Sequence, residues 1–392
     1  MTSPRTLSIA FLSLSAGLAV AGPINPPSGP VVSTGKTLAE VEPAVAINTT
    51  NTPGDSDSQF RITQPGSYYL TGNITGVNGK AGIEVAASGV TIDLRGFAMT
   101  GVSGSLQGVV VVGTGIQNVA VRNGTLTAWG LSAVDTFAGT QCEVESIRAS
   151  LNGGAGVRGG LQNVVRRCTV AQNAGWGITA QTNSIVEGCH ATENLAGGFQ
   201  VQSNTVVSGC CLVGSSSSIG IDALNGCTLS GCSVQLFFTG IQTANDCTVT
   251  ACTSRSNAGP GINAGSGTTV SNCTAGANTT DGIRVSTNCH VYGNNCRQNG
   301  FGAGVGAGIH ATGTDNRIEA NNCTTADTGI DVDVAGNFIT RNTCSGNFVN
   351  NWDLAPGNYC LVVAGVTPGT AIVGNAGGVS PGSSDPNANY TY

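Results

Sequence analysis

The sequence predicts an all-β fold: a right-handed parallel β-helix, or solenoid, of about twelve coils with three short strands in each coil. Two columns of apolar residues recur along the chain at the same phase. A third column of cysteines and asparagines follows the second at a fixed distance. Columns that keep a common phase over many repeats indicate that each repeat is one coil of a stack.

The first column contains apolar residues that mostly follow a glycine. It runs through Ile83, Val109, Val134, Val157, Ile178, Phe199, Ile221, Ile241, Ile262, Ile283, Ile309 and Ile330. The second column runs through Leu94, Val121, Val144, Val165, Val186, Val207, Leu229, Val249, Val270, Val291, Ile318 and Ile339. Between Val144 and Val291 its steps are 20 to 22 residues. Three short alternating runs in each step predict three strands whose like members stack in parallel, about 4.8 Å apart.

The third column lies three residues after the second and changes from cysteine to asparagine. It runs through Cys168, Cys189, Cys210, Cys232, Cys252, Cys273, Asn294, Asn321 and Asn342. A separate asparagine series at constant phase comprises Asn173, Asn194, Asn257, Asn278 and Asn299. Asparagine is favoured in turns, where its amide bonds to nearby backbone, so we expect these amides to bond from coil to coil.

Composition excludes several function classes. Charged residues make up only 9% of the chain, and the net charge is −6. A chain so poor in lysine and arginine is not expected to bind nucleic acid or an anionic membrane surface. The regularly spaced apolar columns provide a core, which argues against disorder despite 59 glycines.

The sequence predicts four segments. Residues 1–21 have the features of a signal peptide: Arg5, a short apolar stretch and an Ala19-Val20-Ala21 cleavage pattern. Residues 22–60 are expected to form an N-terminal arm or cap, 61–350 the β-helix, and 351–392 a C-terminal cap and flexible tail. We therefore expect a secreted, periplasmic or cell-surface protein without a membrane span in the mature chain.

Two blocks of sequence resemble a known family. The segment from Ile62 to Leu70, with that from Gly89 to Phe97, resembles secreted bacterial right-handed β-helix repeat proteins of the pectin-lyase-like superfamily. The block from Gly308 through Asn337 to Asn347 resembles them too, so the resemblance covers roughly residues 60 to 350. It implies the fold, but not an activity, because this superfamily contains lyases, hydrolases, esterases and adhesins. The polygalacturonase and pectin esterase motifs are not recognisable, and the coils from Ile83 onward lack lysine, so a pectate-lyase base near the aspartates would have to be Arg284.

The fifteen cysteines stand in vertical columns. In an exported protein they suggest disulfides. Stacked parallel strands, however, keep Cβ atoms slightly farther apart than a disulfide prefers, which favours small thiols that fill a narrow core. Both readings stay open, and Cys211 is expected to point outward.

Candidate site residues lie on the outward face of the glycine-isoleucine strands. Arg284, His310 and Asp331 are expected to stack at its C-terminal end, with Thr312 and Asp333 two residues farther along their strands. Asp331 and Asp333 are candidates for acid–base catalysis or for binding a calcium ion, and His310 for proton transfer. The neutral middle of the face predicts glycan contacts, and the candidate substrate-binding residues are Arg284, Gln200, Gln202, Gln242, Asn263 and Thr312.

Three functions remain open at this point. The first is a non-catalytic, cell-surface or extracellular module that binds polysaccharide or acts as an adhesin. The second is a polysaccharide lyase or glycoside hydrolase with a divergent site at Arg284, His310, Asp331 and Asp333. The third is a purely structural or assembly solenoid. No cofactor is expected other than the candidate calcium ion, the expected partner is a polysaccharide or cell-surface glycan, and the sequence leaves the oligomeric state open.

Overall fold

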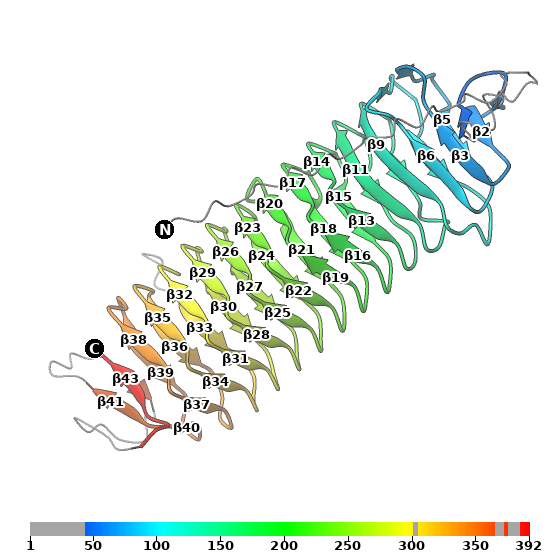
Figure 1. The fold of residues 1–392 in the computed structure, drawn as a ribbon. Helices are drawn as coiled ribbons and strands as arrows, with labels where there is room; N and C mark the ends of the chain where they lie inside the picture. The colour runs from blue at the N-terminus through cyan, green and yellow to red at the C-terminus, as the bar shows by residue number, and fades with distance from the viewer. Residues whose placement is uncertain (1–43, 301–304, 365–371, 375–384) are drawn as a thin grey trace, which may run out of the picture. The chain divides into compact units, whose positions relative to one another are not determined.

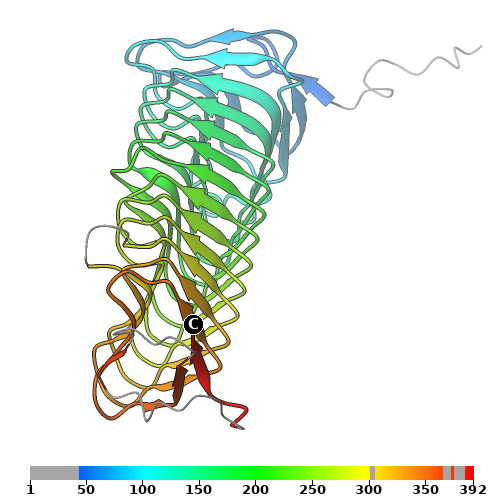
Figure 2. The same cartoon turned by 90° about the vertical axis from the view of Figure 1, so that its left-hand side faces the viewer.

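The computed structural model describes residues 44–300, 305–364, 372–374 and 385–392. In these residues all regular secondary structure is β-strand, and every pairing between the named strands is parallel. Figures 1 and 2 show the strands stacked coil upon coil in chain order. The prediction of an all-β parallel β-helix with three strands in a coil is confirmed.

One strand of each coil contributes to a separate sheet, which we call the first sheet. Its members, in order, are β2 (Ser58–Ile62), β5 (Ala81–Val85), β8 (Val109–Val111), β10 (Val134–Asp135), β12 (Val157–Arg158), β15 (Trp176–Ala180), β18 (Gly197–Val201), β21 (Ile219–Ala223), β24 (Thr239–Thr243), β27 (Ile262–Ala264), β30 (Ile283–Val285), β33 (Ala307–Ala311), β36 (Thr328–Val332), β39 (Asn350–Leu354) and β42 (Ile372–Gly374).

The other two strands of each coil form two further rows. The second row consists of β1 (Ala44–Ala46), β3 (Gly66–Tyr69), β6 (Val90–Asp93), β9 (Ala120–Thr127), β11 (Glu143–Ser150), β13 (Val164–Arg166), β16 (Ile185–Glu187), β19 (Val206–Ser208), β22 (Thr228–Ser230), β25 (Thr248–Thr250), β28 (Thr269–Ser271), β31 (His290–Tyr292), β34 (Arg317–Glu319), β37 (Phe338–Thr340) and β40 (Tyr359–Cys360). The third row consists of β4 (Ile74–Thr75), β7 (Ala98–Thr100), the second halves of β9 and β11, β14 (Thr169–Ala171), β17 (His190–Thr192), β20 (Cys211–Val213), β23 (Ser233–Gln235), β26 (Thr253–Arg255), β29 (Thr274–Gly276), β32 (Asn295–Arg297), β35 (Asn322–Thr324), β38 (Thr343–Ser345), β43 (Asn389–Thr391) and β41 (Val362–Ala364). Because β9 and β11 run through both rows, the two rows are joined into one sheet of 28 strands.

The number of coils differs from the prediction. The first sheet has 15 strands, which gives about fifteen coils instead of about twelve. Phe60 pairs with Ile83 ahead of the predicted column, and Trp352 pairs with Ile330 beyond it. Neither residue follows a glycine, so the pattern that defined the column does not include them.

The register of the first column is as predicted, but that of the second column differs at its start. Val121 pairs with Ile92, not with Leu94. Leu94 lies instead in the corner after β6, where Arg95 and Gly96 both adopt positive φ. Ile92 and Met99 are seven residues apart, whereas their partners Val121 and Leu126 are five apart, so this early corner contains two extra residues.

A single left-handed residue makes most of the corners between the second and third rows. The residues at this position have φ between 51° and 66°; they are Asn123, Ser146, Arg167, Gly188, Gly209, Gly231, Ala251, Asn272, Gly293, Ala320 and Arg341. A left-handed residue turns the chain sharply, and glycine adopts this conformation without steric cost. From Arg167 onward, the residue after each of these turns is buried in the corner and belongs to the cysteine–asparagine column, so the turn fixes the column in register.

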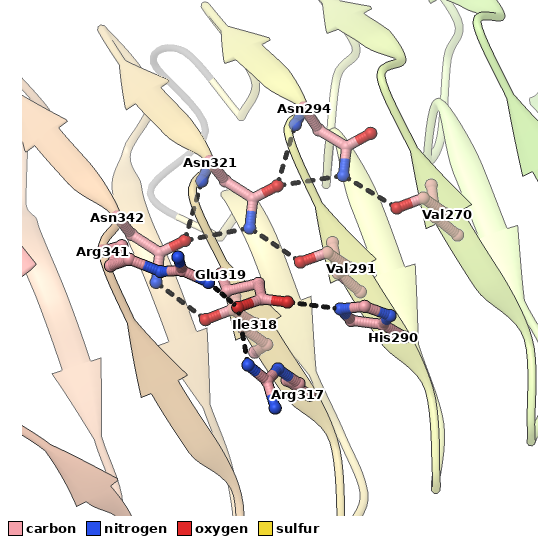
Figure 3. A network of polar contacts seen from close by, with 10 residues as sticks. All are labelled: Val270, His290, Val291, Asn294, Arg317, Ile318, Glu319, Asn321, Arg341 and Asn342. Carbon is pink, nitrogen blue, oxygen red and sulfur yellow. Dashed lines mark hydrogen bonds and ion pairs between the residues drawn. The ribbon is translucent and has the colours of Figure 1, made fainter. Parts of the chain in front are cut away.

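Asparagine ladders connect successive coils through this corner (Figure 3). Asn321 Oδ1 accepts hydrogen bonds from the backbone N and from Nδ2 of Asn294, both at 2.9 Å. Asn321 Nδ2 donates to the Val291 carbonyl and to Asn342 Oδ1, again at 2.9 Å. The second predicted series bonds in the same way, since Nδ2 of Asn173 donates to Oδ1 of Asn194 at 2.8 Å. The predicted coil-to-coil amide bonds are confirmed.

The cysteines fill the inside of the coils. All fifteen are free thiols in the structure, and thirteen of them are buried. At the corner they take the place of the asparagines: Cys252 N donates to Cys273 Sγ at 3.4 Å, whereas Cys273 N donates to Asn294 Oδ1 at 2.9 Å. Cys211 is partly exposed on β20, as expected. The corner column therefore consists of buried thiols, which are weak hydrogen-bond acceptors, as far as Cys273. From Asn294 onward it consists of asparagines.

The two ends of the described chain also belong to the stack. Strand β1 lies inside the segment that the sequence assigns to an N-terminal cap and pairs with β3, and β2, which crosses the predicted boundary at residue 60, pairs with β5. Residues 389–391, in the segment assigned to a flexible tail, form β43, which pairs with β38 and β41. The predicted signal peptide lies outside the described residues.

Replacement of Asn321 by alanine is expected to destabilise the C-terminal coils by about 2 to 4 kcal/mol, because it removes the acceptor of the Asn294 backbone N–H and of one Nδ2 hydrogen of Asn294, and the amide that donates to the Val291 carbonyl. Urea unfolding followed by tryptophan fluorescence measures this change, since the nearby Trp352 is fully buried. Thr324→Ala, an outward substitution in the neighbouring strand, is the control and should change stability by less than about 0.5 kcal/mol. Equal effects of the two substitutions would contradict a structural role for the ladder.

Candidate functional site

The predicted stack of ionisable residues is present at the C-terminal end of the first sheet. Parallel register places Arg284 beside His310, His310 beside Asp331, and Asp331 beside Asp353. These side chains all point outward, since the residues on either side of each are buried core residues. Asp333 follows β36 and its backbone N donates to the Ala311 carbonyl at 3.0 Å, which holds it next to the same coil.

His310 is held between carboxylates on both sides of its ring. Its Nδ1 lies 3.1 Å from Oδ2 of Asp281, and its Nε2 lies 3.1 Å from Oδ2 of Asp333. Oδ2 of Asp331 is also near, at 3.8 Å from Nε2. Two acceptors, one at each ring nitrogen, orient the imidazole and favour its doubly protonated form.

Asp281 is the member of this cluster that the sequence analysis missed. It lies in the turn before β30 and is buried, with 4% of its surface exposed. Its Oδ1 accepts a hydrogen bond from the backbone N of Ala307 at 3.0 Å while Oδ2 contacts His310. Asp281 thus fixes both the start of β33 and the ring of His310.

Two pKa values in the cluster are shifted. Burial lowers the pKa of His310, but the hydrogen bond and charge of Asp281, together with the charges of Asp331 and Asp333, outweigh it and raise the pKa from 6.5 to about 9. Burial raises the pKa of Asp331 from 3.8 to about 6; the charge of His310 opposes this rise, and Asp333, Asp353 and Asp281 add to it. The cluster therefore contains a proton donor, His310, and a carboxyl that titrates close to neutral pH, which are the elements of acid–base chemistry.

Other predicted site residues lie nearby without joining the cluster. Arg284 is exposed and makes no ion pair with the described residues. The hydroxyl of Thr312 donates to the Val285 carbonyl at 3.1 Å, so it is bonded to backbone.

The candidate glycan-binding residues Gln200 and Gln202 lie together farther along the first sheet. With Gln181 and Thr179 they line a hollow of about 170 Å³, which Phe137 and Arg158 border. The Arg158 guanidinium lies 3.8 Å from the centre of the Phe137 ring and 3.3 Å from Asp135. Gln242 and Asn263 occupy the same outward column beyond this hollow, as neighbours of Asp222 and Arg284, and do not line it.

Among the described residues, two groups of side chains are spaced closely enough to share a metal ion. His310, Asp331 and Asp333 each offer an atom within 4.8 Å of the others, and so do Asp55, Asp57 and Glu84. The second group already surrounds a cation, since Arg61 contacts Asp55 and lies 3.1 Å from Glu84. Calcium prefers oxygen ligands, and the first group provides two carboxylates, so calcium at Asp331 and Asp333 stays a prediction.

A third charged cluster, on the second row, is fully occupied by its own residues (Figure 3). Glu319 accepts from Arg317 at 2.9 Å, from Arg341, and lies 2.8 Å from Nε2 of His290. The hydrogen bond from Arg317, with those from His290 and Arg341, lowers the pKa of Glu319 to about 2 against the opposing effect of burial. Because these partners come from β31, β34 and the corner after β37, we interpret the cluster as an ionic contact between coils.

The pKa of His310 predicts an observable titration. The chain has three histidines, so imidazole signals in an NMR pH titration are few, and one of them is expected to titrate at about pH 9. If this signal is absent from the spectrum of the His310→Gln variant, it belongs to His310. A folded-state pKa above the usual 6.5 means that the His310 contacts stabilise the fold fully below pH 6.5 and lose this effect as the pH rises through about 9. If every histidine of the wild type titrated below pH 7, the cluster geometry would be wrong.

The described residues contain no helix that is long and apolar enough to span a membrane.

Residues 81–236 match a family model described as "Right handed beta helix region". Comparison with curated proteins gives no match.

Several solved structures are similar in fold. A tailspike mutant of E. coli bacteriophage HK620 in complex with pentasaccharide has 13% identity and a TM-score of 0.51, over 77% of this chain and 65% of the tailspike chain. The A-module of a mannuronan C-5 epimerase of Azotobacter vinelandii has 15% identity and a TM-score of 0.44, over 71% of this chain and 86% of the module. The chain thus spans slightly less than two thirds of that tailspike. The predicted fold is confirmed: the chain is a right-handed parallel β-helix.

Proposed function

We propose that the protein binds a polysaccharide chain along the outward face of its first sheet. The observation that carries this proposal is the hollow lined by Gln181, Gln200 and Gln202. The three amides come from adjacent coils, β15 to β18, whose register is fixed by parallel pairing. Each amide both donates and accepts hydrogen bonds, as sugar hydroxyls do.

The surroundings of the hollow favour a neutral or weakly charged sugar. Its one lining charge, Arg158, is balanced by Asp135. The ring of Phe137 is 43% exposed and offers an apolar surface beside the amides. A rigid sheet holds these groups in place before binding, which reduces the entropy lost when a ligand binds.

The similarity in fold agrees with this proposal. The HK620 tailspike mutant with this fold was solved in complex with a pentasaccharide. A location outside the cytoplasm, at the cell surface or in the periplasm, belongs to the same proposal and rests on the export signal predicted in residues 1–21.

Removal of either amide should weaken oligosaccharide binding. Gln200→Ala and Gln202→Ala are each expected to reduce the affinity about three- to tenfold, the effect of losing one or two neutral hydrogen bonds. Isothermal titration against a panel of oligosaccharides measures it. Gln235→Ala, on the third row, is the control. Wild-type affinity of both first-sheet variants for every glycan that binds the protein would contradict the proposal.

A second candidate function, a polysaccharide lyase or glycoside hydrolase, is favoured by the His310 cluster. The cluster lies on the same face of the first sheet as the hollow, so a chain bound along the sheet would extend toward it. His310, protonated at neutral pH, would donate a proton to the leaving oxygen, and the Asp331 carboxylate would accept one. Asp281 would keep the imidazole oriented through its bond to Nδ1.

Catalysis would show itself as released reducing or unsaturated ends. In that case Asp331→Asn and His310→Gln are expected to lower the rate about 10²- to 10⁴-fold, as for loss of a general acid or base. Asp315→Asn, an exposed carboxylate in the same region, is the control. Assays with added calcium and with chelator test the predicted calcium site. If a glycan binds and no ends are released under any of these conditions, the protein is a binding module.

A further inference from the structure

A second hollow lies on a different side of the coils, along the third row. It measures about 370 Å³ and extends over β26, β29 and β32. Its outward residues at one register position are Arg255, Gly276 and Arg297, in that order along the stack. We call this hollow the arginine notch.

Gly276 creates the notch. A Cβ atom placed on it would meet only the Arg297 carbonyl oxygen, at 3.4 Å, so the space above it is open. The backbone of Gly276 is not in the left-handed region, which means that no turn requires glycine there. The two arginines one coil away on either side, about 10 Å apart along the stack, form the walls of the hollow.

The notch carries uncompensated positive charge. None of its lining residues is acidic, and neither arginine makes an ion pair with the described residues. Most other arginines of the described residues face carboxylates: Arg122 contacts Asp93, Arg158 contacts Asp135, and Arg317 contacts Glu319, whereas Arg148 and Arg284 stand singly without an ion pair. In a protein with a net charge of −6, two unpaired guanidinium groups around one hollow are a local exception.

Neutral donors complete the lining. The hydroxyls of Thr253 and Thr274 and the amide of Asn295 form a neighbouring column, since these residues pair across β26, β29 and β32. A further hollow of about 270 Å³ shares Ala277 and Gln298 with the notch, so the concave surface continues around the corner of the coil. The surface is therefore long enough for more than one sugar unit.

We propose that the arginine notch binds an acidic polysaccharide through its carboxylate or sulfate-ester groups. The planar guanidinium group bonds to carboxylate and sulfate oxygens through two parallel N–H donors, and the threonine and asparagine side chains suit the sugar hydroxyls. This site goes beyond the glycan binding proposed for the first sheet, because it lies on another face and selects for charge.

The test uses the full chain and three oligosaccharides of equal length: one sulfated, one built from uronic acids and one neutral. The sulfated or the uronic oligosaccharide, or both, should bind, and affinity should fall with rising salt. Arg255→Gln and Arg297→Gln should each reduce affinity at least about tenfold, the usual effect of losing a charged hydrogen-bonding partner. Gly276→Val should do the same while it keeps both arginines, since its side chain would fill the notch.

Arg148→Gln is the matched control, because Arg148 is also an exposed arginine of the third row without an ion pair among the described residues, but lies several coils away. Circular dichroism verifies that each variant is folded. The proposal is overturned if neither acidic oligosaccharide binds, if the neutral one binds equally well, or if Arg148→Gln weakens binding as much as Arg255→Gln. Gln200→Ala leaves the notch intact, so the two glycan-binding proposals can fail separately.

Discussion

The parallel register between coils is the constraint on which the rest of the structure depends. Each backbone strand bonds to the strand one coil away, and a shift of one residue would exchange inward and outward side chains. The left-handed corner residue and the asparagine or cysteine that follows it hold this register. The buried amide of Asn321, bonded to the coil before and the coil after, is the clearest example. Stacking therefore determines which outward residues become neighbours.

This constraint explains how a chain with few charges builds three different polar surfaces. On the first sheet it gathers three glutamines into one hollow and, farther along, His310 among aspartates from several coils. On the second row it surrounds Glu319 with cations, which leaves that carboxylate no free oxygen for a ligand. On the third row it sets two arginines around a glycine. The hollows and the histidine cluster gather several accessible polar groups in one place, and for that reason we assign function to them.

Much of the fold could be predicted from the sequence, because the apolar columns are a direct consequence of stacking. The predicted number of coils was too low because the first apolar column did not include Phe60 and Trp352. Both residues pair in register with that column but do not follow glycines. The prediction was shifted by two residues at Leu94, because the number of residues in that corner cannot be inferred from the column.

The candidate site was predicted in part for a related reason. His310, Asp331 and Asp333 lie at strand positions whose outward direction follows from alternation. Asp281 lies in a turn, where the alternation of inward and outward residues along a strand does not predict which way a side chain points. The only indication in the sequence was its position two residues before Ile283. The arginine notch was not predicted, because Arg255 and Arg297 lie on the third row and all predicted site residues lie on the first sheet.

A double-mutant cycle between Asp281 and His310 tests the central claim, that coil register brings these distant residues into contact. The two residues are 29 positions apart and meet only if the long coil between β30 and β33 closes in the register described. Urea unfolding of the wild type, Asp281→Asn, His310→Gln and the double variant at pH 7 should give a coupling energy between about 0.5 and 3 kcal/mol. The coupling should become weaker above about pH 10, where His310 is neutral and keeps only a hydrogen bond to Asp281. Additivity of the two substitutions at pH 7, within about 0.3 kcal/mol, would contradict the account.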